Sequence, residues 1–183
     1  MEVHSSKSPL FPSARAILRF LIPVRLLMSP REMPSSRLLQ SFGLDEYLAI
    51  AEALQTGSVA TFNRCLEENM AAFIHRGVYF LVERLKMFVY RRLFRRVSGV
   101  HAQSAPSEAE GTRVPIQLFQ AALAWQGEDM ELDEVECILA NLIYRGLIKG
   151  YLSHAHRKIV LMKGSPDQQF PLPQLGDKGL RLI

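Results

Sequence analysis

The chain has 183 residues, of which 48% are hydrophobic and 22% charged, and its formal net charge is +4. This composition is typical of an ordinary soluble globular protein, and the length suffices for one domain, or for a small domain with part of another. No stretch reaches the roughly 18 uncharged apolar residues that a membrane-spanning helix needs, which argues against a transmembrane protein.

The N-terminal region combines a leader with a helix. Residues 1–13 are expected to be a disordered leader, and Ser13 is expected to cap a helix over residues 14–28 that Pro23 kinks or splits. Residues 3–31 contain five cations, several serines and no acid. That composition also fits a transit peptide, so the leader stays open to two interpretations.

Three short amphipathic helices are predicted next, over residues 35–42, 44–54 and 58–68, with a glycine at each joint. Each could bury its apolar stripe only against a neighbouring helix, which is typical of the end of a helical solenoid or bundle. Residues 14–97 are therefore assigned to a helical-repeat part.

A longer helical run is predicted over residues 71–97, and its charge is lopsided. From residue 83 to residue 96 it has one acid, Glu83, and six cations: Arg84, Lys86, Arg91, Arg92, Arg95 and Arg96. The spacing places Arg84, Arg91 and Arg95 on one helix face. Two interpretations stay open: a solvated face that matches the helix dipole, or a stripe that binds phosphate or an acidic partner.

The two cysteines, Cys65 and Cys137, each stand among apolar residues of a predicted helix. Both are therefore expected to be small buried side chains. Nothing indicates a disulfide framework, and a reducing compartment is favoured.

Small polar residues over 98–113 predict a flexible loop, and residues 114–163 then have the element order of a winged helix. A helix over 116–125 precedes a second one from Leu132, with a capping-box variant at Asp133 and Glu136 and a stop at Gly146. LIKGYL and KIVLMK predict two strands joined by the polar turn SHAHR. Helix, connection, helix and β-hairpin is the winged-helix order. The tail, 164–183, is expected to be extended or disordered.

The second winged-helix helix is acidic, whereas such a helix commonly reads the DNA major groove with cations or amides. Between Val114 and Tyr144 the chain has no Lys or Arg and six carboxylates, which would repel phosphates. Sequence-specific reading of the major groove is therefore not expected. The outward residues of this helix, Asp133, Glu134, Glu136 and Tyr144, are candidate contacts with a protein partner, and as a purely structural scaffold the acidic helix would dock a basic neighbour.

The hairpin that follows is basic. Its cations, with no acid among them, are Arg145, Lys149, Arg157, Lys158 and Lys163. This pattern suits contact with a nucleic-acid backbone, which adds affinity without sequence preference. The alternative is a soluble hairpin with ordinary edge lysines.

Other chemistry finds little support in the chain. His154 and His156 flank one residue, but a zinc site needs about four ligands and no cysteine or carboxylate cluster lies nearby in sequence. No phosphate loop, GxSxG or HExxH motif is present. The sequence therefore indicates no enzyme, no cofactor, no metal and no small-molecule substrate.

With helices leading into a terminal winged helix, ILANLIYRGLIKGYLSHAHRKIVLMK resembles the end of a PCI domain, the module shared by the proteasome lid, the signalosome and a translation initiation factor. Three further stretches resemble one branch, the PCI-domain subunit of the nuclear transcription-and-export complex: AILRFLIPVRLLMSPREMPS, FIHRGVYFLVERLKMFVYRRLFRRV and the FPLP of the tail. A signalosome-associated subunit shares the pattern.

The resemblance implies a mainly α fold, in which a helical-repeat bundle packs against a C-terminal winged helix. It implies a non-catalytic scaffold subunit of a nuclear messenger-RNA export complex, at the nuclear pore. The implied partners are a large helical export scaffold, a small acidic disordered subunit, and single- and double-stranded nucleic acid. The resemblance gives five candidate nucleic-acid contacts: Arg91, Arg95, Arg145, Lys149 and Lys158. The charge pattern of the hairpin adds Arg157. The alternative is a structural subunit of a signalosome- or proteasome-lid-like complex with no nucleic-acid role.

Two departures from that family affect these expectations. Its members have a long helical-repeat region upstream, whereas the match here starts near residue 14, so the chain resembles a truncated member. The 98–113 stretch also replaces a segment that is usually more apolar. Lost upstream helices would expose apolar surface on the first helices.

Overall fold

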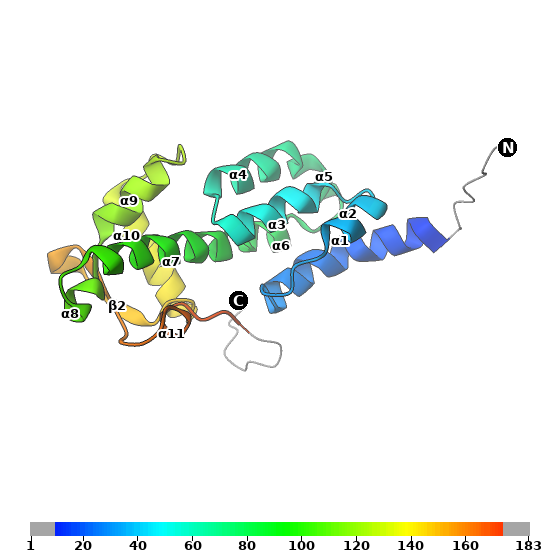
Figure 1. Ribbon diagram of the computed structural model, residues 1–183. Helices are drawn as coiled ribbons and strands as arrows, with labels where there is room; N and C mark the ends of the chain where they lie inside the picture. The colour runs from blue at the N-terminus through cyan, green and yellow to red at the C-terminus, as the bar shows by residue number, and fades with distance from the viewer. Residues whose placement is uncertain (1–9, 174–183) are drawn as a thin grey trace.

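The computed structural model describes residues 10–173, and most of them are helical (Figure 1). The elements are, in order, α1 (Leu10–Met28), α2 (Ser36–Ser41), α3 (Glu46–Thr56), α4 (Val59–Glu68), α5 (Met70–His75), α6 (Tyr79–Arg84), α7 (Lys86–Ser104), α8 (Glu108–Gly111), β1 (Arg113–Pro115), α9 (Ile116–Ala124), α10 (Leu132–Tyr144), β2 (Gly150–Ser153), the 3-10 turn η1 (His154–His156), β3 (Lys158–Leu161) and α11 (Pro166–Gln169).

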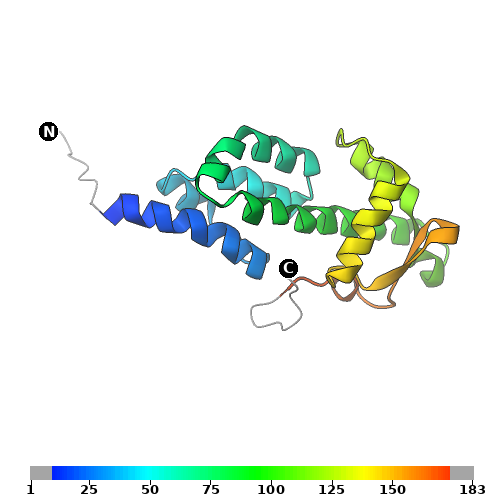
Figure 2. The same ribbon diagram turned by 180° about the vertical axis from the view of Figure 1, so that it is seen from behind.

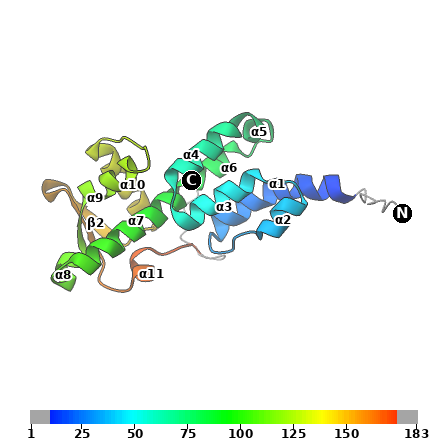
Figure 3. The ribbon, with the colours of Figure 1, turned by 45° about the horizontal axis from the view of Figure 1, so that its top comes forward.

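The molecule is elongated along α7. Helices α1 to α6 gather at one end, and α8, α9, α10 and the sheet gather at the other (Figures 1 and 2). Figure 3 shows α7 running lengthwise through both groups. This arrangement is a helical bundle followed by a winged helix, the expected fold class.

The three predicted short helices are present as α2, α3 and α4, with ends shifted by up to two residues. Serine side chains cap two of them: Ser35 accepts from the Leu38 amide at 3.3 Å, and Ser58 accepts from the Thr61 amide at 3.2 Å. Gly57 ends α3 in the left-handed region, with φ of 78°. Serine caps at two helix starts, and a glycine at the predicted joint, therefore set these helices.

Helix α1 differs from its prediction at its start, and of the kink or split predicted at Pro23 it shows no split. It starts at Leu10, so Ser13 lies inside it rather than capping it, and Pro23 does not split it. Pro23 has no amide hydrogen to donate to the Arg19 carbonyl one turn earlier. The Tyr47 hydroxyl of α3 donates to that carbonyl instead, at 2.7 Å. Residues 1–9 of the predicted leader lie outside the described residues.

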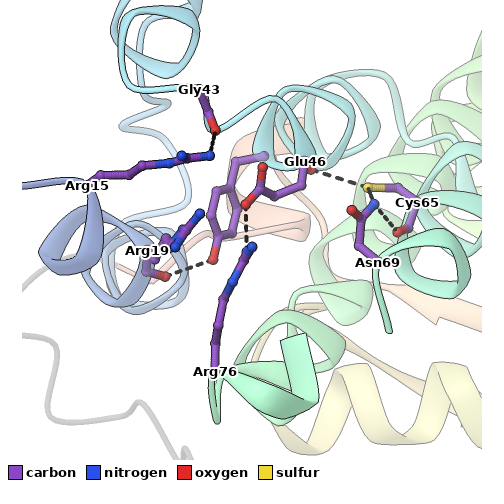
Figure 4. Close-up of polar contacts among 8 residues, drawn as sticks. Arg15, Arg19, Gly43, Glu46, Cys65, Asn69 and Arg76 are labelled. Atoms are coloured by element: carbon purple, nitrogen blue, oxygen red, sulfur yellow. Dashed lines mark hydrogen bonds and ion pairs between the residues drawn. The ribbon is translucent and has the colours of Figure 1, made fainter. Parts of the chain in front are cut away.

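The region around that hydrogen bond ties α1 to the following helices (Figure 4). Arg15 of α1 donates to the Gly43 carbonyl at 2.6 Å. Arg76, which follows α5, pairs with Glu46 of α3 at 2.7 Å, and both side chains are largely buried. Cys65 is buried in α4, as predicted, and its thiol donates to the Glu46 carbonyl at 3.2 Å. Polar contacts as well as apolar packing therefore hold the helical end together.

The predicted run over 71–97 is three helices rather than one. Helix α5 ends before Gly77, whose φ is 69°, and α6 ends at Arg84 before α7 begins. Arg84 therefore stands on a different helix from Arg91 and Arg95, and the predicted common face does not form.

The predicted loop at 98–113 is wrong over most of its length. Helix α7 continues to Ser104, and Ser98 is buried on it. Helix α8 follows, and Arg113 begins a strand. The small polar residues that indicated a loop are compatible with close packing, since the backbone of Gly111 approaches Ala102 of α7.

The winged helix is present and has one more strand than the sequence indicated. The antiparallel sheet has the order β1-β3-β2, and β1 adds to the predicted hairpin. Val114 and Leu152 both lie opposite Ile159, and this row packs into the core. Helix α10 buries an apolar stripe there: Val135, Leu139 and Leu142.

The start of α10 differs from the sequence prediction, whereas its end agrees with the prediction. The capping box is formed by Glu131 and Glu134, two residues before the predicted pair. Gly146 has φ of 72°, as a helix stop requires.

Cys137 is exposed on α10, so its predicted burial is wrong. It stands on the side of the helix away from the core stripe.

One hydrophobic core joins the two ends of the molecule. Phe94 of α7 is fully buried, and its ring meets that of Phe119 of α9 edge-on, with centroids 4.8 Å apart. Gln126, after α9, accepts from the Val59 amide at 2.6 Å. Asn63 of α4 donates to Glu128 at 2.6 Å. The winged helix is therefore packed and hydrogen-bonded onto the bundle.

The described part of the predicted tail, residues 164–173, contains a short helix and packs into the core. Residues Pro166–Gln169 form α11, and Phe170 is buried, so the prediction of an extended or disordered tail is wrong there. Residues 174–183 of the predicted tail lie outside the described residues.

Candidate nucleic-acid interface

The face of the sheet that points away from the core carries a pocket of about 260 Å³. The residues that line this pocket are here called the wing face. These residues are Arg113, Tyr151, Ser153, His156, Lys158 and Val160. The strand register explains why these residues meet. Val160 of β3 lies between Arg113 of β1 and Tyr151 of β2, and Lys158 lies opposite Ser153. Because side chains alternate along a strand, this row and the core row of Val114, Ile159 and Leu152 point to opposite faces.

Positive charge is uncompensated on the wing face. Arg113 and Lys158 are exposed, and neither makes an ion pair within residues 10–173. No carboxylate lines the pocket. Lys149 is exposed immediately before β2 and adds a further cation beside the sheet. This surface can bind an anion without first breaking an internal salt bridge.

Arg157, by contrast, turns away from the wing face. Its backbone is left-handed, with φ of 50°, and its guanidinium pairs with Asp133 and with Glu136 of α10, the latter at 2.9 Å. The hydrogen bond with Asp133 raises the pKa of Arg157. Arg157, predicted to contact nucleic acid, thus forms ion pairs with Asp133 and Glu136, which were predicted to contact a protein partner.

The two histidines at the tip also separate. His154 contacts Glu136 through Nδ1 at 2.8 Å, whereas His156 contacts the Ser153 hydroxyl at 2.9 Å. Glu134 accepts from the Glu131 amide at the start of α10. Much of the acidic face predicted to dock a partner therefore serves the wing tip and the helix cap.

The end of α10 carries the remaining two candidates from the sequence. Tyr144 is 65% exposed and Arg145 is half-buried, and each makes a contact within the molecule. Neither belongs to the wing face.

The cations of α7 are engaged in the fold. Arg92 donates to the Gln55 carbonyl at 2.9 Å, and Arg96 donates to the Thr56 carbonyl at 2.7 Å. Both carbonyls lie in the last turn of α3, where helical carbonyls lack internal partners. Arg95 pairs with Asp167 of α11 at 3.0 Å. The charge pattern read as a binding stripe therefore has structural uses within the bundle.

Arg91 is the clearest departure from prediction, because it is only 2% exposed. Its guanidinium donates to the Pro171 carbonyl at 2.8 Å and also to the Phe170 carbonyl. Burial, with the neighbouring charges of Arg95, Arg31 and Arg92, lowers the pKa of Arg91 to about 10. The side chain is therefore still a cation at neutral pH. It holds the C-terminal segment in place and is not accessible to nucleic acid.

Replacing Arg91 with methionine should lower the free energy of unfolding by about 2 kcal/mol, because two backbone carbonyls lose a charged donor. Methionine keeps the apolar stem and removes the guanidinium. Urea unfolding followed by circular dichroism measures the loss, and limited proteolysis should cut the Arg91→Met protein faster near Phe170. The matched control is Arg37→Met on the exposed face of α2. Equal stability of both variants would contradict the clamp.

Sequence reasoning missed two residues of the wing face, Arg113 and Tyr151. Arg113 stood in a predicted loop, and its strand partner Val160 lies 47 residues further along the chain. No local signal could have paired them. Tyr151 did carry a signal, since it alternates with the inward Leu152 of a predicted strand.

The family model of the PCI domain matches residues 63–163, which is more than half of the chain. The chain belongs to the PCI domain family. The matched region of this PCI domain runs from within α4 to just beyond β3, so it includes α7, the winged helix and every residue that lines the wing face.

Curated relatives agree with this assignment of a PCI domain. The chain is 39% identical over 158 residues to the PCI domain-containing protein 2 homolog of Dictyostelium discoideum, covering 86% of this chain and 34% of the relative. It is 37% identical over 164 residues to Enhanced ethylene response protein 5 of Arabidopsis thaliana, covering 90% and 38%. It is 35% identical over 161 residues to Protein CSN12 homolog of Gibberella zeae, covering 84% and 35%. The chain spans about a third of the length of these relatives.

Proposed function

We propose that this PCI-domain protein is a non-catalytic scaffold subunit of a nuclear messenger-RNA export complex, and that it binds protein partners and nucleic acid without sequence preference. The observation that carries the nucleic-acid role is the uncompensated charge of the wing face, where Arg113 and Lys158 flank an exposed aromatic ring. Lys149 adds an exposed cation just before β2, with its amine near Gly146 at the end of α10.

The electrostatics of the winged helix support backbone contact rather than base reading. Helix α10 carries Asp133 and Glu134 in its first turn and keeps Arg157 as an internal counter-ion. Carboxylates at that position disfavour insertion into a phosphate-lined groove. Cations on the sheet can instead follow the phosphates of any sequence, which gives affinity without specificity.

Two other surfaces support protein partners. Helix α1 exposes an apolar stripe that suits a large helical scaffold subunit: Ile17, Phe20, Leu21, Val24 and Met28. A cleft of about 830 Å³ between α3, α7 and the C-terminal segment is lined by apolar side chains, by Asp167 and by cations that include the exposed Arg31. Arg95 already pairs with Asp167 there, so Arg31 and the apolar side chains are the contacts that this cleft offers to a small acidic disordered subunit.

The nucleic-acid role is tested by reversing two charges, Lys149→Glu with Lys158→Glu. We expect affinity for a labelled oligonucleotide to fall at least about tenfold at low salt. The slope of log affinity against log salt should shrink by about 1.4 for a single strand and about 1.8 for a duplex, because two phosphate contacts are lost. Fluorescence anisotropy over a salt series measures both quantities. Arg37→Glu on α2 makes a single charge reversal far from the sheet and should leave the slope unchanged (Figure 1).

The alternative function is that of a structural subunit of a signalosome- or proteasome-lid-like complex. The similarity to Protein CSN12 homolog of Gibberella zeae supports this alternative. Absence of nucleic-acid binding by the folded protein at low salt, where electrostatic attraction is strongest, would remove the nucleic-acid role. Co-purification with lid or signalosome subunits, and not with export subunits, would then select the alternative.

A further inference from the structure

Tyr151 occupies the wing face in a way that packing does not explain. Its side chain is 62% exposed at the centre of β2, and no hydrogen bond or ring contact within the described part of the chain engages it. The core-facing residue of the same strand is Leu152, so the tyrosine ring is not needed to fill the winged-helix core. A large aromatic ring left on the open face of a short strand is available to a ligand.

The neighbours of Tyr151 define the kind of ligand. Val160 lies directly opposite it on β3, and Arg113 lies beyond Val160 on β1. Lys158 and the Ser153–His156 pair complete the rim of the pocket. The site thus combines one apolar ring surface with cations on two strands, and it has no carboxylate. A flat apolar group joined to a phosphate satisfies both features at once.

We propose that Tyr151 is a stacking platform for an unpaired base, so that the wing face binds single strands more tightly than duplexes of the same sequence. Bases inside a duplex are stacked on each other and cannot offer a face to a protein ring, whereas an unpaired base can. Arg113 and Lys158 contact the adjoining phosphates. This inference rests on the proposed nucleic-acid role and specifies which form of nucleic acid the site selects.

The platform is tested with three labelled ligands of equal length: a twelve-residue pyrimidine strand, the same backbone with abasic positions, and the strand in a duplex. Tyr151→Ala should weaken binding of the intact single strand by about fivefold to a hundredfold, the range measured for loss of one stacked base. The same variant should change binding of the abasic strand and the duplex by less than about twofold. Tyr151→Phe keeps the ring and should retain the affinity of the unmodified protein.

The pyrimidine strand is used both as RNA and as DNA, because either source offers an unpaired base on a phosphate backbone. A loss confined to one of them would assign the platform to that strand type. An equal loss on all three ligand designs, or no loss on any of them, would overturn stacking.

The variant that reverses the charges of both Lys149 and Lys158 distinguishes failure of the stacking platform from failure of the proposed nucleic-acid role. If that reversal weakens binding while Tyr151→Ala does not, the nucleic-acid role stands and the platform is rejected. If the unmodified protein binds none of the ligands at low salt, both are rejected. Circular dichroism establishes that each variant is folded, and the exposed position of Tyr151 predicts no loss of stability.

Discussion

Replacing Phe94 with alanine should lower the free energy of unfolding by about 3–5 kcal/mol, the usual cost of truncating a buried phenylalanine. Phe94 has no exposed surface, meets Phe119 edge-on at 4.8 Å and stacks on Tyr90 with ring centroids 6.0 Å apart. It stands on the helix that both ends of the molecule share. The loss is large beside the 5–15 kcal/mol that stabilises a typical domain.

Urea unfolding monitored by circular dichroism measures this effect, and Phe80→Ala is the matched control. Phe80 is 74% exposed on α6, so the same chemical change should cost less than about 1 kcal/mol. The Phe94→Ala variant should still unfold in one transition, because the bundle and the winged helix share their core. A small loss, or two separate transitions, would show that the two ends are stabilised independently.

Replacing Gly57 with alanine should cost about 3 kcal/mol or more, from two causes that act together. The residue has φ of 78°, a conformation that costs roughly 1–2 kcal/mol for an L side chain. An added Cβ would also lie 2.8 Å from the Leu93 amide nitrogen of α7, which is backbone and cannot rotate away. Helix α3 would have to withdraw from α7, and the hydrogen bonds from Arg92 and Arg96 to its last turn would lengthen.

Gly77 separates the two causes. Its φ is 69°, close to that of Gly57, but an added Cβ there would meet nothing within 4 Å. Gly77→Ala should therefore show the conformational cost alone, roughly 1–2 kcal/mol. The difference between the two variants in urea unfolding measures the close approach of α3 to α7. Equal losses at both positions would mean that the approach contributes nothing to stability.

Local signals in the sequence account for much of the fold. Hydrophobic periodicity predicted the short helices and the second winged-helix helix, and glycine signals placed helix ends at Gly57 and Gly146. Alternation predicted the hairpin. These features depend on residues within one or two turns of each other, so a one-dimensional pattern contains them.

The errors fall where distant residues decide the local structure. A carbonyl freed by Pro23 is satisfied by Tyr47, so α1 continues past a point where a kink or a split was expected. Strand β1 exists because Val160 pairs with it, although its own surroundings predicted a loop. Phe170 is ordered because the core and Arg91 hold it. Long-range packing overrode local propensity at each of these points.

The sequence by itself determined the three short helices, the helix–helix–hairpin order of the winged helix and the concentration of positive charge on α7 and the hairpin. Only the tertiary structure decided which of those charges can meet a ligand. It buries Arg91, pairs Arg157 with Asp133 and brings Arg113 next to Tyr151 and Lys158. The physical reason is that a cation's availability depends on its burial and on the counter-ions around it, and both are set by residues far away along the chain.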